Sequence, residues 1–155
     1  MRRKDREVTD FDRITEILHS CDCCRVGFSD KNGVYIVPMN FGFTEYNRKI
    51  TLYFHGAASG RKYELIKTNP HVGFEADTKH ELVSGNAACE FSYKYQSIVG
   101  NGDISLVEAK GEKLNGLKII MSHYTGICDW DIPQSALEKT AVFKLEVTEL
   151  SCKEH

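Results

Sequence analysis

The two adjacent cations Arg61 and Lys62 have the clearest chemical potential in this sequence. They follow residues 52–60, in which a strand-like run passes through glycine, alanine and serine into a helical pattern. The first turn of a helix has unpaired N–H groups and the positive end of the helix dipole, so two cations there favour a negative ligand. A phosphate fits, because Arg61 can bind two oxygens in a fork while Lys62 adds a point charge. The alternative is a pair of solvated surface residues.

His55 ends the strand-like run that precedes these cations. An imidazole among aromatic strand residues is often a structural group. It could instead donate a proton to a reduced acceptor or hold an anionic substrate. From its place in the chain alone, both roles of His55 stay open.

Three cysteines lie close together, and two of them, Cys21 and Cys24, have the Cys-x-x-Cys spacing of zinc ligands. No second pair of ligands follows at a suitable spacing, and Cys23 and Cys24 stand where a buried strand is expected to begin. We therefore interpret them as small core residues and predict no metal site. All six cysteines are expected to be reduced thiols, because the charged start of the sequence is unlike an export signal.

The hydrophobic pattern predicts the elements that carry these residues. Helical spacing is present at residues 11–20, 59–68 and 108–124, with Ser59 as the candidate cap of the second helix. Strands are expected at residues 23–28, 34–43, 50–55, 71–76, 89–95, 97–107 and 141–150. Pro38 cannot donate a ladder hydrogen bond, so its strand should lie at a sheet edge or contain a bulge. Several short antiparallel strands with few helices indicate a small barrel with flanking helices.

The composition is that of one ordinary globular domain over residues 1–155, with 41% hydrophobic and 27% charged residues. A formal net charge of −2 gives no whole-molecule attraction to nucleic acid or to an anionic membrane. No apolar run approaches the roughly 18 residues of a membrane helix. We therefore expect a cytoplasmic protein that binds neither nucleic acid nor membrane, and that holds any anion locally.

Several short motifs resemble, in the same order, those of the FMN-binding split-barrel superfamily typified by pyridoxamine 5′-phosphate oxidase. They are Tyr53-Phe54-His55, Ser59-Gly60-Arg61-Lys62, Glu64-Leu65 and Asn69-Pro70. Residues 35–42, 54–57, 97–100 and 120–126 are similar to the branch of this superfamily named for nitroimidazole resistance. The resemblance implies a mainly β fold, a six-stranded antiparallel split barrel with flanking helices. It also implies a homodimer with an FMN at each of two subunit-interface sites.

The cofactor contacts that the resemblance implies fall into three groups. One edge of the isoalloxazine ring would be lined by Val37, Pro38, Met39 and Asn40. The ring and the ribityl chain would be flanked by Phe54, His55 and Gly56. The phosphate would be held by Arg61 and Lys62, and Ser97 would reach the cofactor from a paired strand or subunit. In the nitroimidazole-resistance branch the matching histidine lies at the flavin, so His55 is the candidate catalytic residue.

The function that the resemblance implies is an FMN-dependent oxidoreductase that reduces nitroaromatic or related small acceptors, with a reduced nicotinamide as donor. Two alternatives stay open. One is a pyridoxamine 5′-phosphate oxidase-type enzyme, although the Arg-x-His substrate motif of those oxidases is not visible near the C-terminus. The other is a non-catalytic flavin- or haem-binding module, in which His55 or His71 would be a haem ligand.

Overall fold

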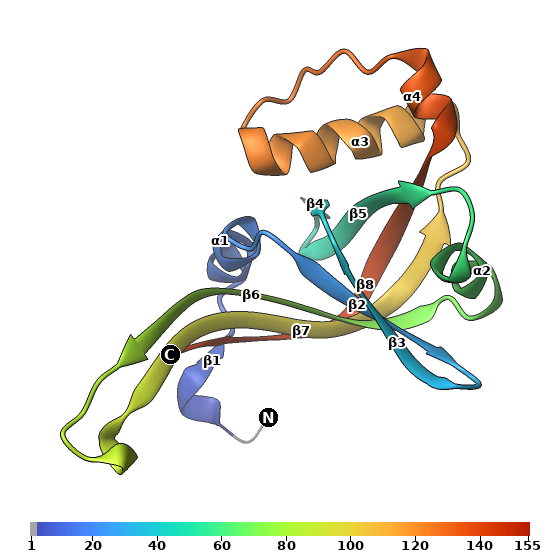
Figure 1. The fold of residues 1–155 in the computed structure, drawn as a ribbon. Coiled ribbons are helices and arrows are strands. Elements are labelled where there is room, and N and C mark those ends of the chain that lie inside the picture. Colours follow the sequence, from blue (N-terminus) through green and yellow to red (C-terminus); the bar gives the residue numbers. More distant parts are fainter. Residues whose placement is uncertain (1–2) are drawn as a thin grey trace.

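The structure is a computed structural model that describes residues 3–155, so the first two residues of the predicted domain lie outside it. The described residues form one antiparallel sheet of eight strands in the order β3-β2-β6-β7-β8-β5-β4, with β1 paired to β8. The strands are β1 (Glu7–Val8), β2 (Cys24–Asp30), β3 (Gly33–Met39), β4 (Phe41–Tyr46), β5 (Lys49–Ala57), β6 (His71–Val83), β7 (Ser92–Leu106) and β8 (Thr140–Glu154). The sheet curls on itself, and the mainly β fold expected from the sequence is confirmed (Figure 1).

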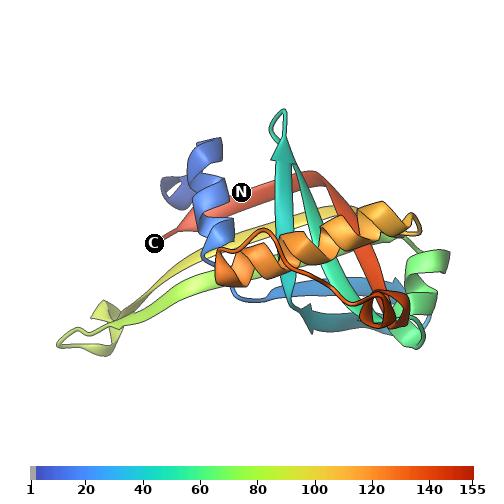
Figure 2. The same ribbon diagram turned by 90° about the horizontal axis from the view of Figure 1, so that it is seen from above.

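The helices lie on the outside of the curled sheet. They are α1 (Phe11–His19), α2 (Arg61–Thr68), α3 (Lys110–Thr125) and α4 (Gln134–Lys139), with 3-10 turns at Lys4–Arg6 and Ala88–Glu90. Helix α3 lies across β4 and β5, as the view from above shows (Figure 2). Within residues 3–155, no helix combines the length and the apolar character needed to cross a membrane.

The two edges of the sheet are joined by the chain itself. Strand β3 is first in the sheet order and β4 is last, yet only Asn40 separates them along the sequence. Because β3 pairs with β2 and β4 pairs with β5, the chain passes from one half of the sheet to the other at this residue. The two halves of the barrel are therefore connected covalently at residues 39–41, which we call the seam.

Eight strands are present where the resemblance implies six. The short β1 was not expected, and the strand predicted at residues 34–43 is divided at the seam. Pro38 lies in the edge strand β3, as its missing N–H predicted. Strand β6 continues to Val83, and β7 is one strand whose pairing with β8 shifts register between Asn101 and Gly102. Helix α4 was missed because six residues are too few to display a helical period.

A row of phenylalanines crosses the core. Phe41 on β4 is opposite Phe54 on β5, which is opposite Phe143 on β8, and all three are fully buried. Contacts of this kind across strands stabilise both the pairing of the strands and the core. The row therefore packs β5 into the core immediately before His55 and Gly56.

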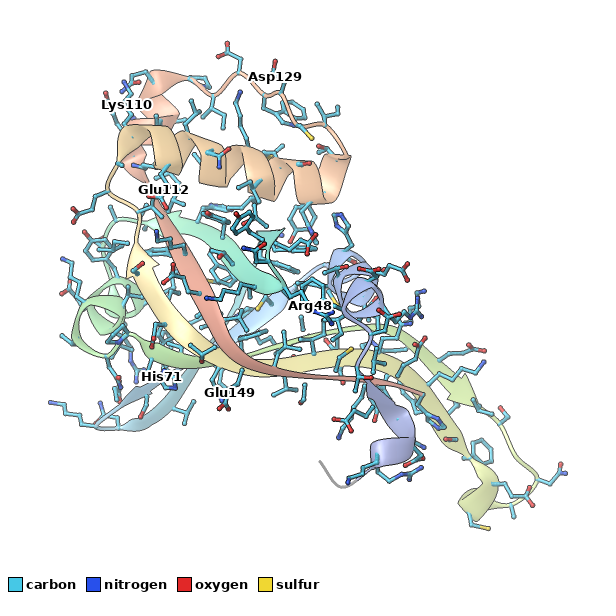
Figure 3. The ribbon with its side chains drawn as sticks, turned by 180° about the vertical axis from the view of Figure 1, so that it is seen from behind. Arg48, His71, Lys110, Glu112, Asp129 and Glu149 are labelled. Atoms are coloured by element: carbon cyan, nitrogen blue, oxygen red, sulfur yellow. The ribbon has the colours of Figure 1, made fainter. Side chains whose placement is uncertain are left out.

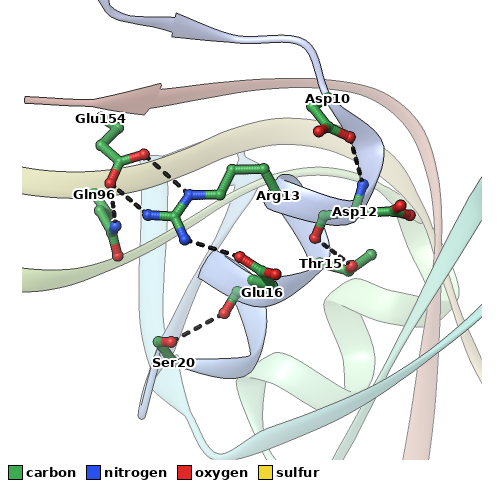
Figure 4. A network of polar contacts seen from close by, with 8 residues as sticks. All are labelled: Asp10, Asp12, Arg13, Thr15, Glu16, Ser20, Gln96 and Glu154. Atoms are coloured by element: carbon green, nitrogen blue, oxygen red, sulfur yellow. Dashed lines mark hydrogen bonds and ion pairs between the residues drawn. The ribbon is translucent and has the colours of Figure 1, made fainter.

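A polar network attaches helix α1 to the end of β8. The helix is capped by Asp10, whose carboxylate accepts a hydrogen bond from the Asp12 N–H at 3.1 Å. Arg13 Nε donates to Glu154 on β8 at 3.1 Å, and the buried Gln96 on β7 donates to the same carboxylate at 2.6 Å (Figure 4). One carboxylate thus connects the helix to two neighbouring strands.

The cysteine cluster contributes to the core, as predicted. Cys21 and Cys24 are fully buried, and Cys23 is partly buried. Burial raises the pKa of the Cys21 thiol to about 12, so this thiol stays protonated near neutral pH. Among residues 3–155, no group of three or more metal-ligating side chains gathers in one place.

Two glycines allow helix α3 to lie directly on the sheet. A Cβ at Gly42 on β4 would lie 2.5 Å from the carbonyl oxygen of Ile119, and one at Gly116 would lie 3.0 Å from side chains of β5 and β8. Lys144 on β8 also donates to Glu112 on α3 at 2.9 Å, and Figure 3 shows Glu112 on the helix beside the sheet. The helix is therefore fixed close to the seam by a backbone contact and an ion pair.

Replacing Gly42 by Ala should destabilise the protein, because the added methyl group meets the backbone of α3. Overpacking of this kind costs about 1–3 kcal/mol. Urea unfolding followed by circular dichroism measures the loss. The matched control is Gly111→Ala on α3, where a Cβ has open space, and this variant should be unchanged or up to about 1 kcal/mol more stable. Equal stability of the Gly42→Ala variant and the unmodified protein would contradict the close contact.

Candidate functional site

The seam brings three of the predicted site residues together. Lys62 Nζ donates to Met39 Sδ at 3.3 Å and lies 5.2 Å from the centre of the Phe143 ring. Gly56 is beside it, since a Cβ at this glycine would lie 2.8 Å from Lys62 Nζ. The ammonium group therefore lies between the end of β3 and β5, where the two halves of the sheet meet.

Lys62 is a partly buried cation without a carboxylate partner. Among residues 3–155, no Asp or Glu side chain forms an ion pair with it. Its neighbours, a thioether and an aromatic ring, attract a cation without neutralising it. Burial lowers the pKa of Lys62, as expected when an ammonium loses water without gaining a negative partner. A negatively charged ligand would compensate this unpaired charge.

Arg61 is held by the hairpin of β2 and β3. Its Nε and Nη2 donate to Asp30 Oδ2 at 3.1 and 2.5 Å, and its guanidinium carbon lies 4.3 Å from the centre of the Tyr35 ring. The hydrogen bonds from Arg61 lower the pKa of Asp30. Because these bonds use the Nε edge of the guanidinium, the donors on Nη1 remain available to an oxyanion.

The two neighbouring cations therefore reach different ends of the same hairpin. Asp30 is the last residue of β2, whereas Met39 is opposite Cys24, the first residue of β2. These positions are roughly 20 Å apart along the strand at about 3.3 Å per residue. Arg61 and Lys62 therefore have different partners in the structure.

The start of α2 follows β5 after only three residues, and Gly60 is its N-cap. Gly60 has a φ of 98°, a region that glycine adopts readily and other residues rarely do. The prediction that Ser59 caps this helix is wrong, because the chain reaches the first turn through Gly60 and no side chain bonds to it. The N–H groups of this turn thus have no side-chain cap among the described residues, which is compatible with an anion there.

His55 lies on β5 opposite Val142, and it is exposed. Partial desolvation of the imidazole, followed by the positive charge of Lys62, lowers the pKa of His55. Its ordinary pKa is about 6.5, so the ring is mainly neutral at pH 7 and can donate one hydrogen bond and accept another. The charge of Lys62 thus affects the protonation of His55.

The remaining predicted contacts differ in their exposure. Val37 is partly buried, Pro38 and Asn40 are exposed, and Phe54 is fully buried in the core. Ser97 is on β7, and β6 and β2 separate it from β3 within the sheet. One chain therefore does not bring Ser97 to the seam.

Three residues at the site were not predicted from the sequence: Asp30, Tyr35 and Phe143. Asp30 stands in a turn-forming segment, where an aspartate is expected for the turn alone, and it does accept the Asn32 N–H at 2.6 Å. The aromatic residues follow strand patterns that indicate only packing. No local signal in the sequence connects any of the three to Arg61 or Lys62.

Comparison with known proteins extends this description. The sequence pattern of the family Pyridoxamine 5′-phosphate oxidase matches residues 10–154, which is most of the chain. No protein of curated function matches the sequence.

Three solved structures are similar to this chain. A candidate 5-nitroimidazole antibiotic resistance protein from Bacteroides thetaiotaomicron is 33% identical, with a TM-score of 0.81 over 96% of this chain and 86% of that chain. The flavocytochrome Anf3 from Azotobacter vinelandii is 20% identical, with a TM-score of 0.81 over 100% of this chain and 72% of that chain. An FAD and heme binding protein from Mycobacterium smegmatis is 16% identical, with a TM-score of 0.79 over 96% of this chain and 73% of that chain. These similarities confirm the split-barrel fold expected from the sequence.

The effect of Lys62 on His55 can be measured directly. Replacing Lys62 by Met removes the positive charge and keeps a side chain of similar shape. The pKa of His55 should therefore rise, while partial desolvation still holds it below that of a free imidazole. NMR titration measures this shift, with the His55 signals assigned from a His55→Gln sample. An unchanged titration would show that the charge of Lys62 does not reach this ring.

The same shift determines how His55 affects stability. The folded chain binds the His55 proton less readily than the unfolded chain does, so this residue should lower the free energy of unfolding as the pH falls below about 6.5. Burial also lowers the pKa of His123. Between pH 7.5 and 5.5, the free energy of unfolding of the His55→Gln variant should thus decrease less than that of the unmodified protein. It should still decrease in part, because His123 is unchanged.

Proposed function

Because this chain belongs to the pyridoxamine 5′-phosphate oxidase family, we propose that it is a cytoplasmic FMN-dependent oxidoreductase. Its substrates in this proposal are nitroaromatic or related small acceptors, and its donor is a reduced nicotinamide. The observation that carries the proposal is the unpaired, partly buried ammonium of Lys62 between Met39 and Gly56. The nitroaromatic class is supported by the 33% identity to the candidate nitroimidazole resistance protein.

The residues at the end of β5 and at the start of α2 fit this cofactor. Arg61 keeps donors free at the start of α2, where none of residues 3–155 supplies a side-chain cap to the helix turn, and this suits a phosphate. The missing side chain at Gly56 lets the Lys62 ammonium lie against β5, since a Cβ there would lie only 2.8 Å from Lys62 Nζ. When bound, FMN would supply the transfer of hydride and electrons, which side chains alone cannot perform.

In this reaction, the role of the protein is to bind the flavin and to orient the acceptor. His55 would contact the acceptor, because it is exposed at the end of β5 directly before Gly56. A neutral imidazole there can donate a hydrogen bond to a nitro oxygen or accept one from a reduced product. Because desolvation and the charge of Lys62 lower the pKa of His55, the ring would be mainly neutral and would position the acceptor by hydrogen bonds rather than as a fixed cation.

The proposal is tested first by the absorption spectrum of the purified protein, before and after addition of FMN. Visible flavin bands, together with nicotinamide-dependent reduction of a nitroimidazole, support the proposed function. A Soret band without flavin bands would favour a haem-binding module. A protein that neither contains nor takes up FMN would contradict the proposal.

Replacing His55 by Gln should lower kcat/KM for a nitro acceptor by about 100-fold while FMN remains bound, because a group that positions or protonates the acceptor is lost. Steady-state reoxidation of the reduced protein by the acceptor measures the rate, and flavin absorbance measures the occupancy. Full occupancy with an unchanged rate for every acceptor would show that His55 is structural.

We also propose the homodimer that the resemblance implies, because apolar side chains are exposed on one outer face of the sheet, beside the ion pair of Arg25 and Glu75. Val34 and Ile36 on β3 are 70% and 62% exposed, and Val99 on β7 is 51% exposed. Between them, two glycines opposite each other on β2 and β6 line a shallow groove of about 380 Å³. By strand alternation, Pro38 is on the same outer side of β3, so a second copy seated here would lie next to the predicted ring edge.

Replacing Ile36 by Lys should convert a dimer to a monomer, because a charge would be buried in the interface without a partner. Sedimentation velocity measures the mass of each species. The control is Ile127→Lys in the loop after α3, where the isoleucine is also exposed, at 52%, and this variant should remain dimeric. A monomeric unmodified protein that retains one FMN per chain would contradict the dimer.

A further inference from the structure

We infer that Tyr124 is a positioning residue, whose hydroxyl takes the place of a hydrogen bond between β2 and β3 and so sets the path of the seam. The hydroxyl accepts a hydrogen bond from the Phe41 N–H at 3.1 Å and donates one to the Asp22 carbonyl at 2.8 Å. It therefore joins the residue that follows Asn40 to the segment that precedes β2. The effect of Tyr124 on a flavin rests on the proposed function, whereas the bridge between the two strands does not.

The register of the β2–β3 hairpin shows which hydrogen bond the hydroxyl replaces. Cys24, the first residue of β2, is opposite Met39, the last residue of β3. If this pairing continued by two residues, Asp22 would be opposite Phe41. The Phe41 N–H could then donate directly to the Asp22 carbonyl, as in any antiparallel ladder. These are the two backbone groups that the Tyr124 hydroxyl contacts instead.

The proline in β3 supports this assignment. In an antiparallel ladder, pairs that exchange hydrogen bonds alternate with pairs that do not. Pro38 has no N–H, so its pair with Arg25 fits the kind without hydrogen bonds. Three positions further along, the pair of Asp22 with Phe41 would be of the hydrogen-bonded kind. The hydroxyl thus lies at a position where the ladder would otherwise form its next bond.

The inserted hydroxyl ends the hairpin where the chain passes to the other half of the sheet. The N–H and the carbonyl bond through the hydroxyl rather than to each other, and Phe41 is opposite Phe54 on β5. Phe41 is fully buried, and a buried backbone group without a hydrogen-bond partner is costly. Tyr124 therefore supplies a partner at the crossing that neither strand supplies.

Helix α3 holds the hydroxyl in this position. Its C-terminal end lies beside the end of α1, as the view from above shows (Figure 2). His123 Nε2 contacts the Cys21 carbonyl at 2.8 Å, and it must carry the ring proton because a carbonyl only accepts. Neighbouring residues of α3 thus hold neighbouring carbonyls of the segment before β2. The close contact of the helix with Gly42 fixes it on β4 as well.

The bridge acts on the candidate site through the seam. Met39 lies two residues before Phe41, and its sulfur accepts the hydrogen bond from Lys62. Under the proposed function, FMN binds beside this ammonium. Tyr124 contacts neither Met39 nor Lys62 through its hydroxyl, so it would affect the flavin by fixing the backbone between Phe41 and Met39.

The experiment compares the Tyr124→Phe variant with Thr78→Val as a matched control. Thr78 Oγ1 donates to the Ser20 carbonyl at 2.9 Å, so the control also removes a hydroxyl that holds the segment before β2, but one that does not reach Phe41. NMR measures hydrogen exchange at the Phe41 amide in the purified protein without added FMN. Quenching of flavin fluorescence gives the dissociation constant for FMN, and visible circular dichroism reports the surroundings of the bound flavin.

In Tyr124→Phe, the Phe41 amide should exchange about tenfold faster, because it loses its hydrogen bond. The dissociation constant for FMN should rise about fivefold, with a changed circular dichroism spectrum of the bound flavin, because the seam is less fixed. Thr78→Val should leave the Phe41 exchange, the affinity for FMN and the spectrum as they are in the unmodified protein.

The inference is overturned if the Phe41 amide exchanges at the same rate in Tyr124→Phe and in the unmodified protein, or if Thr78→Val has an equal effect. Faster exchange with unchanged FMN affinity and an unchanged spectrum would show that Tyr124 is structural only, and the proposed function would survive that result. If the unmodified protein binds no FMN, the proposed function fails and the positioning role fails with it. The exchange rates then still decide whether the hydroxyl replaces the ladder bond.

Discussion

The connection at Asn40 between the two edge strands is the constraint on which the rest of the structure depends. Strands β3 and β4 are the first and last of the sheet but are consecutive in the chain, so the sheet must curl until its edges meet. Pro38 removes one N–H from β3 just before the seam, and Gly42 just after it lets α3 lie against β4. The same junction thus closes the barrel and lets its longest helix, α3, pack on β4. It also leaves Met39 beside β5.

The seam gives two neighbouring cations different surroundings. The short connection through Gly60 starts α2 directly after β5, so Arg61 and Lys62 emerge beside the two ends of one hairpin. Arg61 is paired with Asp30 and exposed, whereas Lys62 is partly buried and unpaired within the described residues. A charge that is partly desolvated and lacks a counterion costs stability, and such groups are common at functional sites. We therefore regard Lys62 as the residue that most clearly indicates a ligand.

Most of the fold could be predicted from the sequence because its signals are local. Strand alternation and the turn before Gly33 located the strands. The missing N–H of Pro38 placed β3 at an edge of the sheet. The break at Asn40 could not be predicted, because it depends on which strands β3 and β4 pair with. The cap at Ser59 was wrong for a related reason, since the positive φ at Gly60 is required by the path of the chain and not by the helix pattern. The residue types at the site were predictable, but their partners came from distant parts of the sequence.

The central claim is that this chain binds FMN beside the partly buried ammonium of Lys62, close to Met39 and Gly56. A crystal structure of the protein with FMN tests it most directly. The account predicts a bound FMN that contacts Met39 and Gly56 and that accepts hydrogen bonds from the side chains at the start of α2. A structure in which the flavin lies away from Met39, Gly56 and Lys62 would contradict the account.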